Sequence, residues 1–322
     1  MTGSLRIVGI NALLHFLVDG ICACCLFQML ADHDVADTVA VILTYDILAF
    51  MTQPLTGWVA DFLNGTRKML LVAVALLVAA VAVADIAATG ELTLFCVAVL
   101  LGMGNSLFHV WGGKSVAVST GNDIRALGVF VATGAVGLTT GILFHSWPLL
   151  LTYVVMICGV SARGSIYLPE AEKCVEAEQV TTSPRHSEWG SWGEVFIFLL
   201  LLMSVVMFRS FLGEAFGLGI EKDTTLILII SATVLAGKMS GGWIARRFGI
   251  VRSMAVVVVG IAVCAFLRES SIIAFLFGLF LINTTMPVTL YLANVLLPKR
   301  EGLAFGLLAA VLVPGYLLAQ LL

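Results

Sequence analysis

The chain has 322 residues, of which 60% are hydrophobic and 11% are charged, and its mean hydropathy is +1.08. A soluble domain carries roughly 25% charged residues, so this composition excludes an ordinary water-soluble globular protein. The formal net charge of −3 is uninformative for such a chain, and we expect no nucleic acid partner.

Apolar stretches near 20 residues recur along the whole chain, and each is long enough to cross about 30 Å of hydrocarbon. Because a backbone in lipid must satisfy its own hydrogen bonds, we expect helices at each crossing. The first stretch is too long for a signal peptide and lacks a cleavage site, so we interpret it as a retained span. The sequence predicts eleven spans, at residues 7–30, 39–61, 69–88, 91–112, 126–145, 148–167, 193–215, 224–244, 253–268, 271–296 and 303–321.

Basic residues favour the cytoplasmic side of a membrane, and their placement here predicts a cytoplasmic N-terminus. With that orientation only Lys222 and Arg268 fall in outside loops. The inside loops then contain Arg6, Arg67, Lys68, Lys114, Arg125, Arg163, Lys173, Arg185, Arg246, Arg247, Arg252, Lys299 and Arg300.

The sequence divides into two parts around its one long polar stretch. We predict an N-terminal six-helix half at 1–167, a cytoplasmic linker at 168–192 that is too polar to bury a core, and a C-terminal half of five helices at 193–322. The halves resemble repeats, because the sequence GWVAD at 57–61 is matched by GWIAR at 242–246. The chain is expected to lack a twelfth span, so that either its C-terminus lies outside or it is a shortened version of a longer one.

The stretch from Gly102 to Phe144 predicts two spans joined by a short polar loop. Gly134, Gly137 and Gly141 lie in the second of these spans, where glycines let a neighbouring helix approach closely.

At these residues the chain resembles the major facilitator superfamily of transporters, and more closely the branch of the fosmidomycin-resistance efflux proteins. That branch has a phenylalanine–histidine pair late in its fourth helix, an arginine before the fifth helix and a glycine-rich fifth helix; here these are Phe108-His109, Arg125 and the three glycines. The resemblance implies the facilitator fold, an all-α membrane protein of two pseudo-symmetric halves with the substrate path between them.

The stretch from Gly57 to Lys68 matches the superfamily's loop between helices two and three. The resemblance implies that Gly57 permits close helix packing, and that Asp61, with Arg67 and Lys68, locks the cytoplasmic side while the transporter faces out. The alternative is an ordinary acidic helix end with basic flanks. In the second copy Gly242 is retained, but Arg246 stands where an aspartate is usual, so the presence of a second charge latch is left open.

Two basic groups follow in the fourth span and its loop. His109 comes about 18 residues into a helix of 1.5 Å rise per residue, which predicts a position near the cytoplasmic end. It either serves a proton relay or hydrogen-bonds a neighbouring helix. Lys114 either holds an anionic group or follows the positive-inside bias.

Asp19, Asp46 and Arg209 are predicted in the outer half of the membrane. Ionisable residues at such depth usually face a cavity or pair with one another. In the facilitator architecture the first and seventh helices face each other, so Asp19 and Arg209 are candidates for a pair that forms when the outer gate closes. A static structural ion pair is the alternative. Gln53-Pro54 is expected to form a helix bend in which a carbonyl freed by proline finds another partner.

The sequence has no Walker-type loop, and neither a nucleophile–base pair nor a metal-ligand spacing that links cysteine to histidine. We therefore expect no enzyme, no cofactor and no metal, but a monomeric secondary active transporter of a small solute in the cell membrane, the inner membrane if the source is a bacterium. Export in exchange for protons is what the resemblance implies. Ile142 follows Gly141 where proton-coupled exporters usually have proline, which keeps uptake and facilitated diffusion open. A non-transporting membrane sensor or assembly subunit is the alternative of another class.

Overall fold

Helices of membrane-spanning length make up the computed structural model, which describes residues 2–63, 67–86, 90–163 and 192–322. The first part of the chain consists of α1 (Thr2–Leu30), α2 (Val35–Asp46), η1 (Ile47–Met51), α3 (Gln53–Phe62), α4 (Arg67–Ile86), α5 (Glu91–Ser119), α6 (Ile124–Leu143) and the helix Trp147–Arg163. The second part consists of α8 (Trp192–Ala215), α9 (Thr224–Phe248), α10 (Ile250–Leu267), α11 (Ile272–Leu296), α12 (Glu301–Ala310) and α13 (Leu312–Ala319).

These helices account for the eleven predicted spans. Within the described ranges, ten helical segments are long and apolar enough to cross a membrane, among them Val35–Phe62 and Glu301–Ala319, and Trp147–Arg163 is a shorter apolar helix. Large apolar side chains on the outside, such as Phe266 at 88% exposed, are those expected of a surface that faces lipid. The predicted linker lies outside the described residues apart from Trp192.

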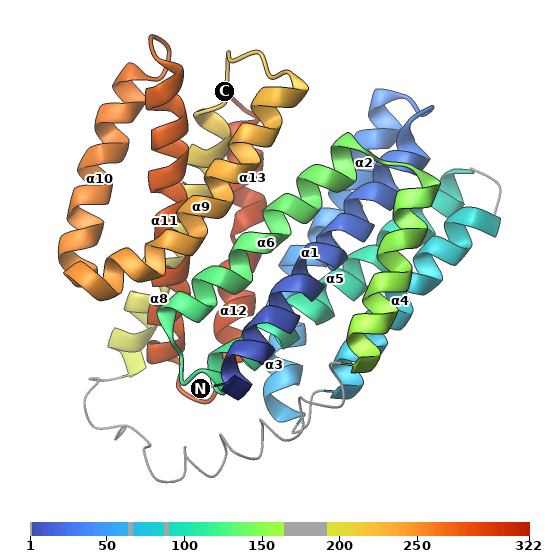
Figure 1. The fold of residues 1–322 in the computed structure, drawn as a ribbon, viewed down its shortest axis with the longest axis horizontal. Helices are drawn as coiled ribbons and strands as arrows, with labels where there is room; N and C mark the ends of the chain where they lie inside the picture. The colour runs from blue at the N-terminus through green and yellow to red at the C-terminus, as the bar shows by residue number, and fades with distance from the viewer. Residues whose placement is uncertain (1, 64–66, 87–89, 164–191) are drawn as a thin grey trace.

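The N-terminus lies at the same end of the molecule as the start of α8, and the C-terminus lies at the opposite end (Figure 1). We call the first end the linker side and the second the far side. The ends of α3 and α5 and the starts of α6 and α12 lie on the linker side.

Several helices continue past the predicted ends of the spans. The fourth span was expected to end at residue 112, whereas α5 runs to Ser119, and α9 runs to Phe248. The sequence placed Lys114 and Arg246 in loops, and this was wrong: Lys114 lies in α5 and Arg246 in α9. His109 lies ten residues before the end of α5, deeper than the position near the cytoplasmic end that we predicted. The reason is that headgroup regions add about 10–15 Å to the hydrocarbon thickness, and polar helix ends extend through them.

The second span contains a break in its helical geometry. A π-helical turn, η1, separates α2 from α3 directly before Pro54. The Gln53 amide donates to the Ala49 carbonyl at 2.7 Å, and the Thr52 hydroxyl donates to the Leu48 carbonyl at 2.6 Å. Side chains thus satisfy carbonyls at the bend, as expected for a proline in a membrane helix.

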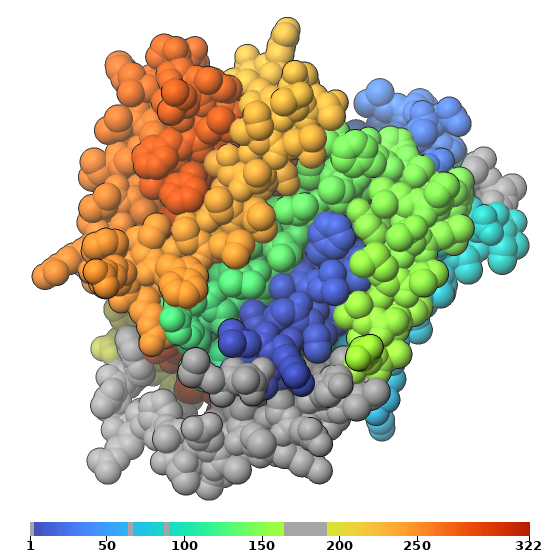
Figure 2. Space-filling model, viewed as in Figure 1, coloured from blue at the N-terminus to red at the C-terminus, as the bar shows by residue number. Residues whose placement is uncertain are grey.

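Helix α6 lies along the seam between the two parts of the chain. It packs against α1 on one side and α9 on the other, and Figure 2 shows it as a continuous green band between them. The loop before α6 and the loop before α12 share a backbone feature, because Asn122 and Lys299 have φ values of 60° and 65° two residues before their helices begin. This agreement is typical of a repeat.

Candidate functional site

A cavity of about 550 Å³ lies between the two parts of the chain. Helices α1, α5 and α6 line it from the first part, and α8, α9, α11 and α12 line it from the second. Most of its wall is apolar. Its ionisable side chains are His15, Asp19, His109, Arg209, Glu214, Lys222 and Lys238.

Two buried histidines and one carboxylate form a hydrogen-bonded cluster in the α1–α5 wall. The Nε2 atoms of His15 and His109 lie 2.9 Å apart. Asp19 lies beside both, with Oδ2 3.3 Å from His15 Nε2 and Oδ1 3.5 Å from His109 Nε2. The Asn105 amide also donates to Asp19 Oδ1, at 3.2 Å.

The outer nitrogens of the two rings determine how many protons the cluster holds. His15 Nδ1 lies 2.7 Å from the Phe130 carbonyl, and His109 Nδ1 lies 3.0 Å from the Asn105 carbonyl. Carbonyls only accept, so both Nδ1 atoms carry hydrogen. Two neutral rings would then place two lone pairs face to face at 2.9 Å. One further proton between the Nε2 atoms removes that repulsion, so this geometry fits a histidine pair with a single positive charge, balanced by Asp19.

The same three side chains form a group whose ligand atoms lie within 4.8 Å of one another, as in a metal site. Two nitrogens on a tetrahedral zinc ion, each at about 2.0–2.1 Å from the metal, would stand about 3.3 Å apart. The observed 2.9 Å between the Nε2 atoms is a hydrogen-bond distance. A shared proton therefore fits this geometry better than zinc.

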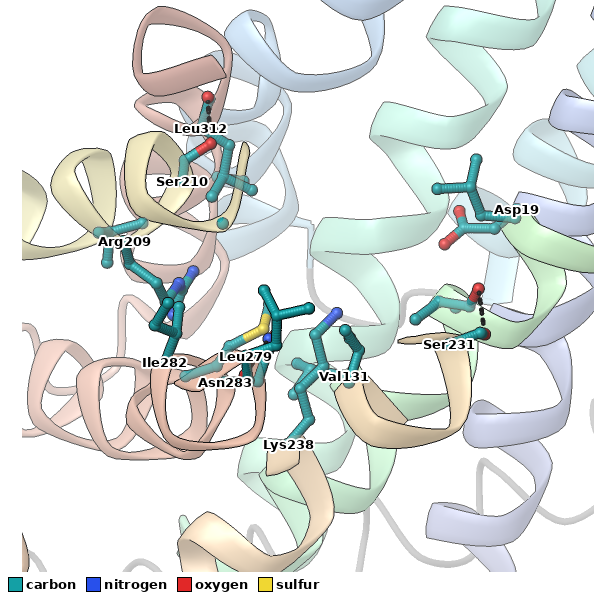
Figure 3. A pocket seen from close by; sticks show the side chains of 18 of the residues that line it. Asp19, Val131, Arg209, Ser210, Ser231, Lys238, Leu279, Ile282, Asn283 and Leu312 are labelled. Carbon is teal, nitrogen blue, oxygen red and sulfur yellow. Dashed lines mark hydrogen bonds between the residues drawn. The ribbon is translucent and has the colours of Figure 1, made fainter. Parts of the chain in front are cut away.

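The opposite wall carries two cations. Figure 3 shows Arg209 extending into the pocket from α8 and Lys238 from α9, with the Asp19 carboxylate facing them from the other side. Within the described residues, Arg209 Nη1 is buried and has no hydrogen-bond partner. At the far-side end of the cavity Glu214 and Lys222 lie close enough to influence each other.

On the linker side, α3 and α12 meet through Asp61. Its fully buried carboxylate accepts hydrogen bonds from the backbone N–H groups of Gly302 and Leu303, both at 2.9 Å. These N–H groups open α12, whose first turn has no side-chain cap, so the carboxylate supplies the missing acceptor. Lys114 of α5 balances the charge at 3.4 Å.

The second copy of the motif, GWIAR at 242–246, also contacts the start of a helix, but it does so through a cation where the first copy uses a carboxylate. Arg246 at the end of α9 lies 3.2 Å from Asp123, which caps the start of α6. Because α6 already has a carboxylate at its N-terminus, its partner on α9 has to be a cation. Arg125 also binds Asp123, at 2.6 Å, and holds the pKa of this loop carboxyl below its ordinary value. The contact should therefore persist at neutral pH and be lost only as the pH falls below the usual range for an aspartate.

Solved structures share this architecture, among them two structures of FucP. A major facilitator superfamily transporter, FucP, in the outward conformation has a TM-score of 0.58 and 13% identity, with 98% of this chain and 91% of that chain covered. The chain has the major facilitator fold. A second crystal structure, of the E. coli fucose:proton symporter FucP, gives a TM-score of 0.56 at 13% identity, with 97% and 89% covered. No protein-family model matches the sequence, and no curated protein matches it.

Within this facilitator fold the residues predicted from the sequence fall into three places. Asp19, His109 and Arg209 line the cavity, whereas Asp61, Lys114 and Arg246 make the linker-side contacts. Asp46, Arg67 and Lys68 belong to neither set: Asp46 ends α2 and does not line the cavity, and Arg67 and Lys68 are exposed at the start of α4. In this structure Asp19 contacts the two histidines and forms no ion pair with Arg209 among the described residues, so their pairing when the outer gate closes stays a prediction.

The predicted glycines bring helices into backbone contact. Gly137 and Gly141 face the backbone of α1, and a Cβ at Gly134 would overlap the Asp19 carboxylate and the His15 ring. Gly57 meets Gly302, and Gly242 meets the start of α6.

Sequence reasoning missed His15 and Lys238. The available signal for His15 was its spacing of four residues from Asp19, which places both on one helix face.

Proposed function

We propose that this protein is a proton-coupled secondary transporter that moves a small solute across the membrane by alternating access. The observation that carries the proposal is the cavity between the two parts of the chain, which holds charged groups at membrane depth and is bounded on the linker side by the Asp61 and Arg246 contacts. Such charges are expensive in a membrane and are usually functional.

Alternating access requires contacts that form on one side and break on the other. Asp61 joins α3 to α12, and Arg246 joins α9 to α6, so each contact links one part of the chain to the other. Both contacts have to break before the cavity can open to the linker side. With the linker in the cytoplasm, as the basic residues predict, the structure corresponds to a state that faces outward.

The histidine pair supplies the proton site. While the shared proton is present, Asp19 has a positive neighbour on its own side of the cavity. When the proton leaves, the Asp19 carboxylate faces Lys238 of the other part without that neighbour. Attraction between them would draw α1 towards α9 and narrow the cavity, which links proton release to closure.

The direction of transport follows from the resemblance to the efflux branch at Phe108-His109 and Arg125, which implies export in exchange for protons. Uptake with protons is the alternative, and the E. coli protein of the same fold is a fucose:proton symporter.

A flux screen in proteoliposomes tests the proposal. Purified protein should move at least one small solute across the bilayer, and the rate or the accumulated amount should change when a pH gradient is imposed. Transport that depends on no pH gradient would leave facilitated diffusion. Absence of any solute flux, from a protein that is folded by size-exclusion chromatography, would favour a non-transporting sensor.

A further inference from the structure

Two cations in the cavity wall have no anion of their own. Among the described residues, neither Arg209 nor Lys238 takes part in a hydrogen bond or an ion pair, and Nη1 of Arg209 is buried from solvent. A buried charge without a partner is costly, and intramembrane cations usually pair with carboxylates or bind a ligand.

Among the described residues, no carboxylate lies within ion-pair distance of either cation, although Asp19 attracts Lys238 across the cavity. Asp19 lies across the cavity and contacts His15 and His109, while Glu214 lies at the far-side end with Lys222. With the histidine pair and Asp19 balancing each other, the deep part of the cavity keeps the two positive charges of Arg209 and Lys238. The missing partner is therefore an anion that enters from outside the chain.

The rest of the cavity defines the remainder of the ligand. Its volume of about 550 Å³ is within the usual range for small-molecule sites. Apolar side chains such as Val131, Leu279 and Ile282 line it beside the two cations (Figure 3). A guanidinium binds carboxylate or phosphonate oxygens in a bidentate manner, and a lysine adds a point charge.

We propose that Arg209 and Lys238 bind the anionic head group of a small organic anion, whose short apolar body lies against the neighbouring side chains. The inference rests on the proposed transport function and names its substrate class. The cations come from α8 and α9, and the apolar wall from α6 and α11, so the ligand contacts both parts of the chain. Movement of one part of the chain relative to the other would therefore change the contacts of the ligand.

Binding of matched probes to purified wild-type protein tests the inference. Hexanoate and pentylphosphonate share a pentyl chain and differ in head group, whereas hexanamide has the same chain with a neutral head group and chloride has no apolar part. Isothermal titration should show saturable binding of at least one of the two organic anions, and neither hexanamide nor chloride should bind comparably. The anion that binds with the higher affinity identifies the head group that the site prefers. Equal binding of hexanamide, or no binding of either anion, would overturn the inference.

Variants then locate the site. Arg209→Gln and Lys238→Gln should each weaken binding of the preferred anion by about 10- to 100-fold, the usual effect of losing a charged hydrogen-bond partner. Arg252→Gln removes an exposed cation at the start of α10 and should leave the affinity unchanged. If Arg209→Gln does not fold, Arg209→Lys keeps the charge and should lose mainly the bidentate contact. Unchanged affinity in the Lys238→Gln and Arg209→Lys variants would contradict the assignment.

The two proposals fail separately. Anion binding without any solute flux would retain the site and remove the transport function, whereas flux of neutral or cationic solutes alone would retain transport and remove the anion site.

Discussion

At the scale of single residues, the account depends on the proton that His15 and His109 share beside Asp19. Both Nδ1 atoms donate to backbone carbonyls, so the two Nε2 atoms can form a hydrogen bond with each other only if that proton lies between them. Asp19 then acts as the counter-charge of the pair. A carboxylate in this position is needed to retain the proton, but it need not touch the solute.

Asp19→Asn should therefore uncouple the transporter. The side chain keeps its size but loses its charge, so the positively charged histidine pair loses its counter-charge. Exchange of solute across the membrane should continue, while accumulation against a concentration gradient should be lost. Radiolabelled solute in proteoliposomes, with and without a pH gradient, measures both quantities. Retention of full pH-driven accumulation would show that Asp19 is not part of the proton site.

At the scale of helices, the two linker-side contacts each join the end of one helix to the start of another, but Asp61 does so with a negative charge and Arg246 with a positive one. Helix α12 has no side-chain cap, and Asp61 of α3 supplies the acceptor for its first N–H groups. Helix α6 is capped by its own Asp123, and Arg246 of α9 binds that carboxylate. The sequence showed Arg246 where an aspartate is usual but could not show its partner. That partner is 123 residues away along the chain and is reached only through the packing of α9 on α6.

Asp61→Asn should shift the protein away from the state that is closed on the linker side. The buried carboxylate accepts two backbone hydrogen bonds and faces Lys114. Loss of charged hydrogen bonds typically costs about 1.5–3 kcal/mol, a shift of about 10- to 100-fold in the equilibrium. A cysteine at Gly213 reports this change, because Gly213 lines the cavity and a Cβ there meets nothing within 4 Å.

In a background without native cysteines, labelling of Gly213→Cys by an impermeant thiol reagent should slow when Asp61→Asn is added. An unchanged labelling rate together with intact transport would reduce Asp61 to an ordinary helix-end residue.

Gly137→Ala should lower the yield of folded protein. Its Cβ would collide with the Phe16 carbonyl of α1, and overpacking of this kind usually costs about 1–3 kcal/mol. Gly9→Ala provides the matched control, since a Cβ at Gly9 meets nothing within 4 Å. Thermal stability in detergent, followed by fluorescence-detected chromatography, compares the two variants. Equal melting temperatures would contradict the packing argument.

At the scale of the whole molecule, much of the architecture could be predicted from the sequence. Bilayer thickness sets the length of a membrane-spanning helix, so the apolar stretches predicted the helices. The GWVAD and GWIAR copies indicated a repeat. The cavity could be predicted only in part. His15 and Lys238 were missed because single-span patterns do not show which side chains from α1, α5 and α9 meet.

Orientation in the membrane is a further prediction from the basic residues. Cys174 belongs to the predicted cytoplasmic linker, which lies outside the described residues. In a variant with Cys174 as its single cysteine, an impermeant thiol reagent should label inside-out vesicles and not intact cells. Labelling of intact cells would reverse the assignment of the linker side to the cytoplasm.

The most direct test of proton coupling measures proton and solute movement in the same proteoliposomes, with a pH-sensitive dye trapped inside. The wild-type protein should move protons whenever a transported solute is added, and the sign of the pH change distinguishes export in exchange for protons from uptake with them. His15→Gln and His109→Gln should abolish the solute-dependent proton signal while some solute exchange remains. Solute flux without proton movement in the wild type, or an unchanged proton signal in both variants, would contradict the account.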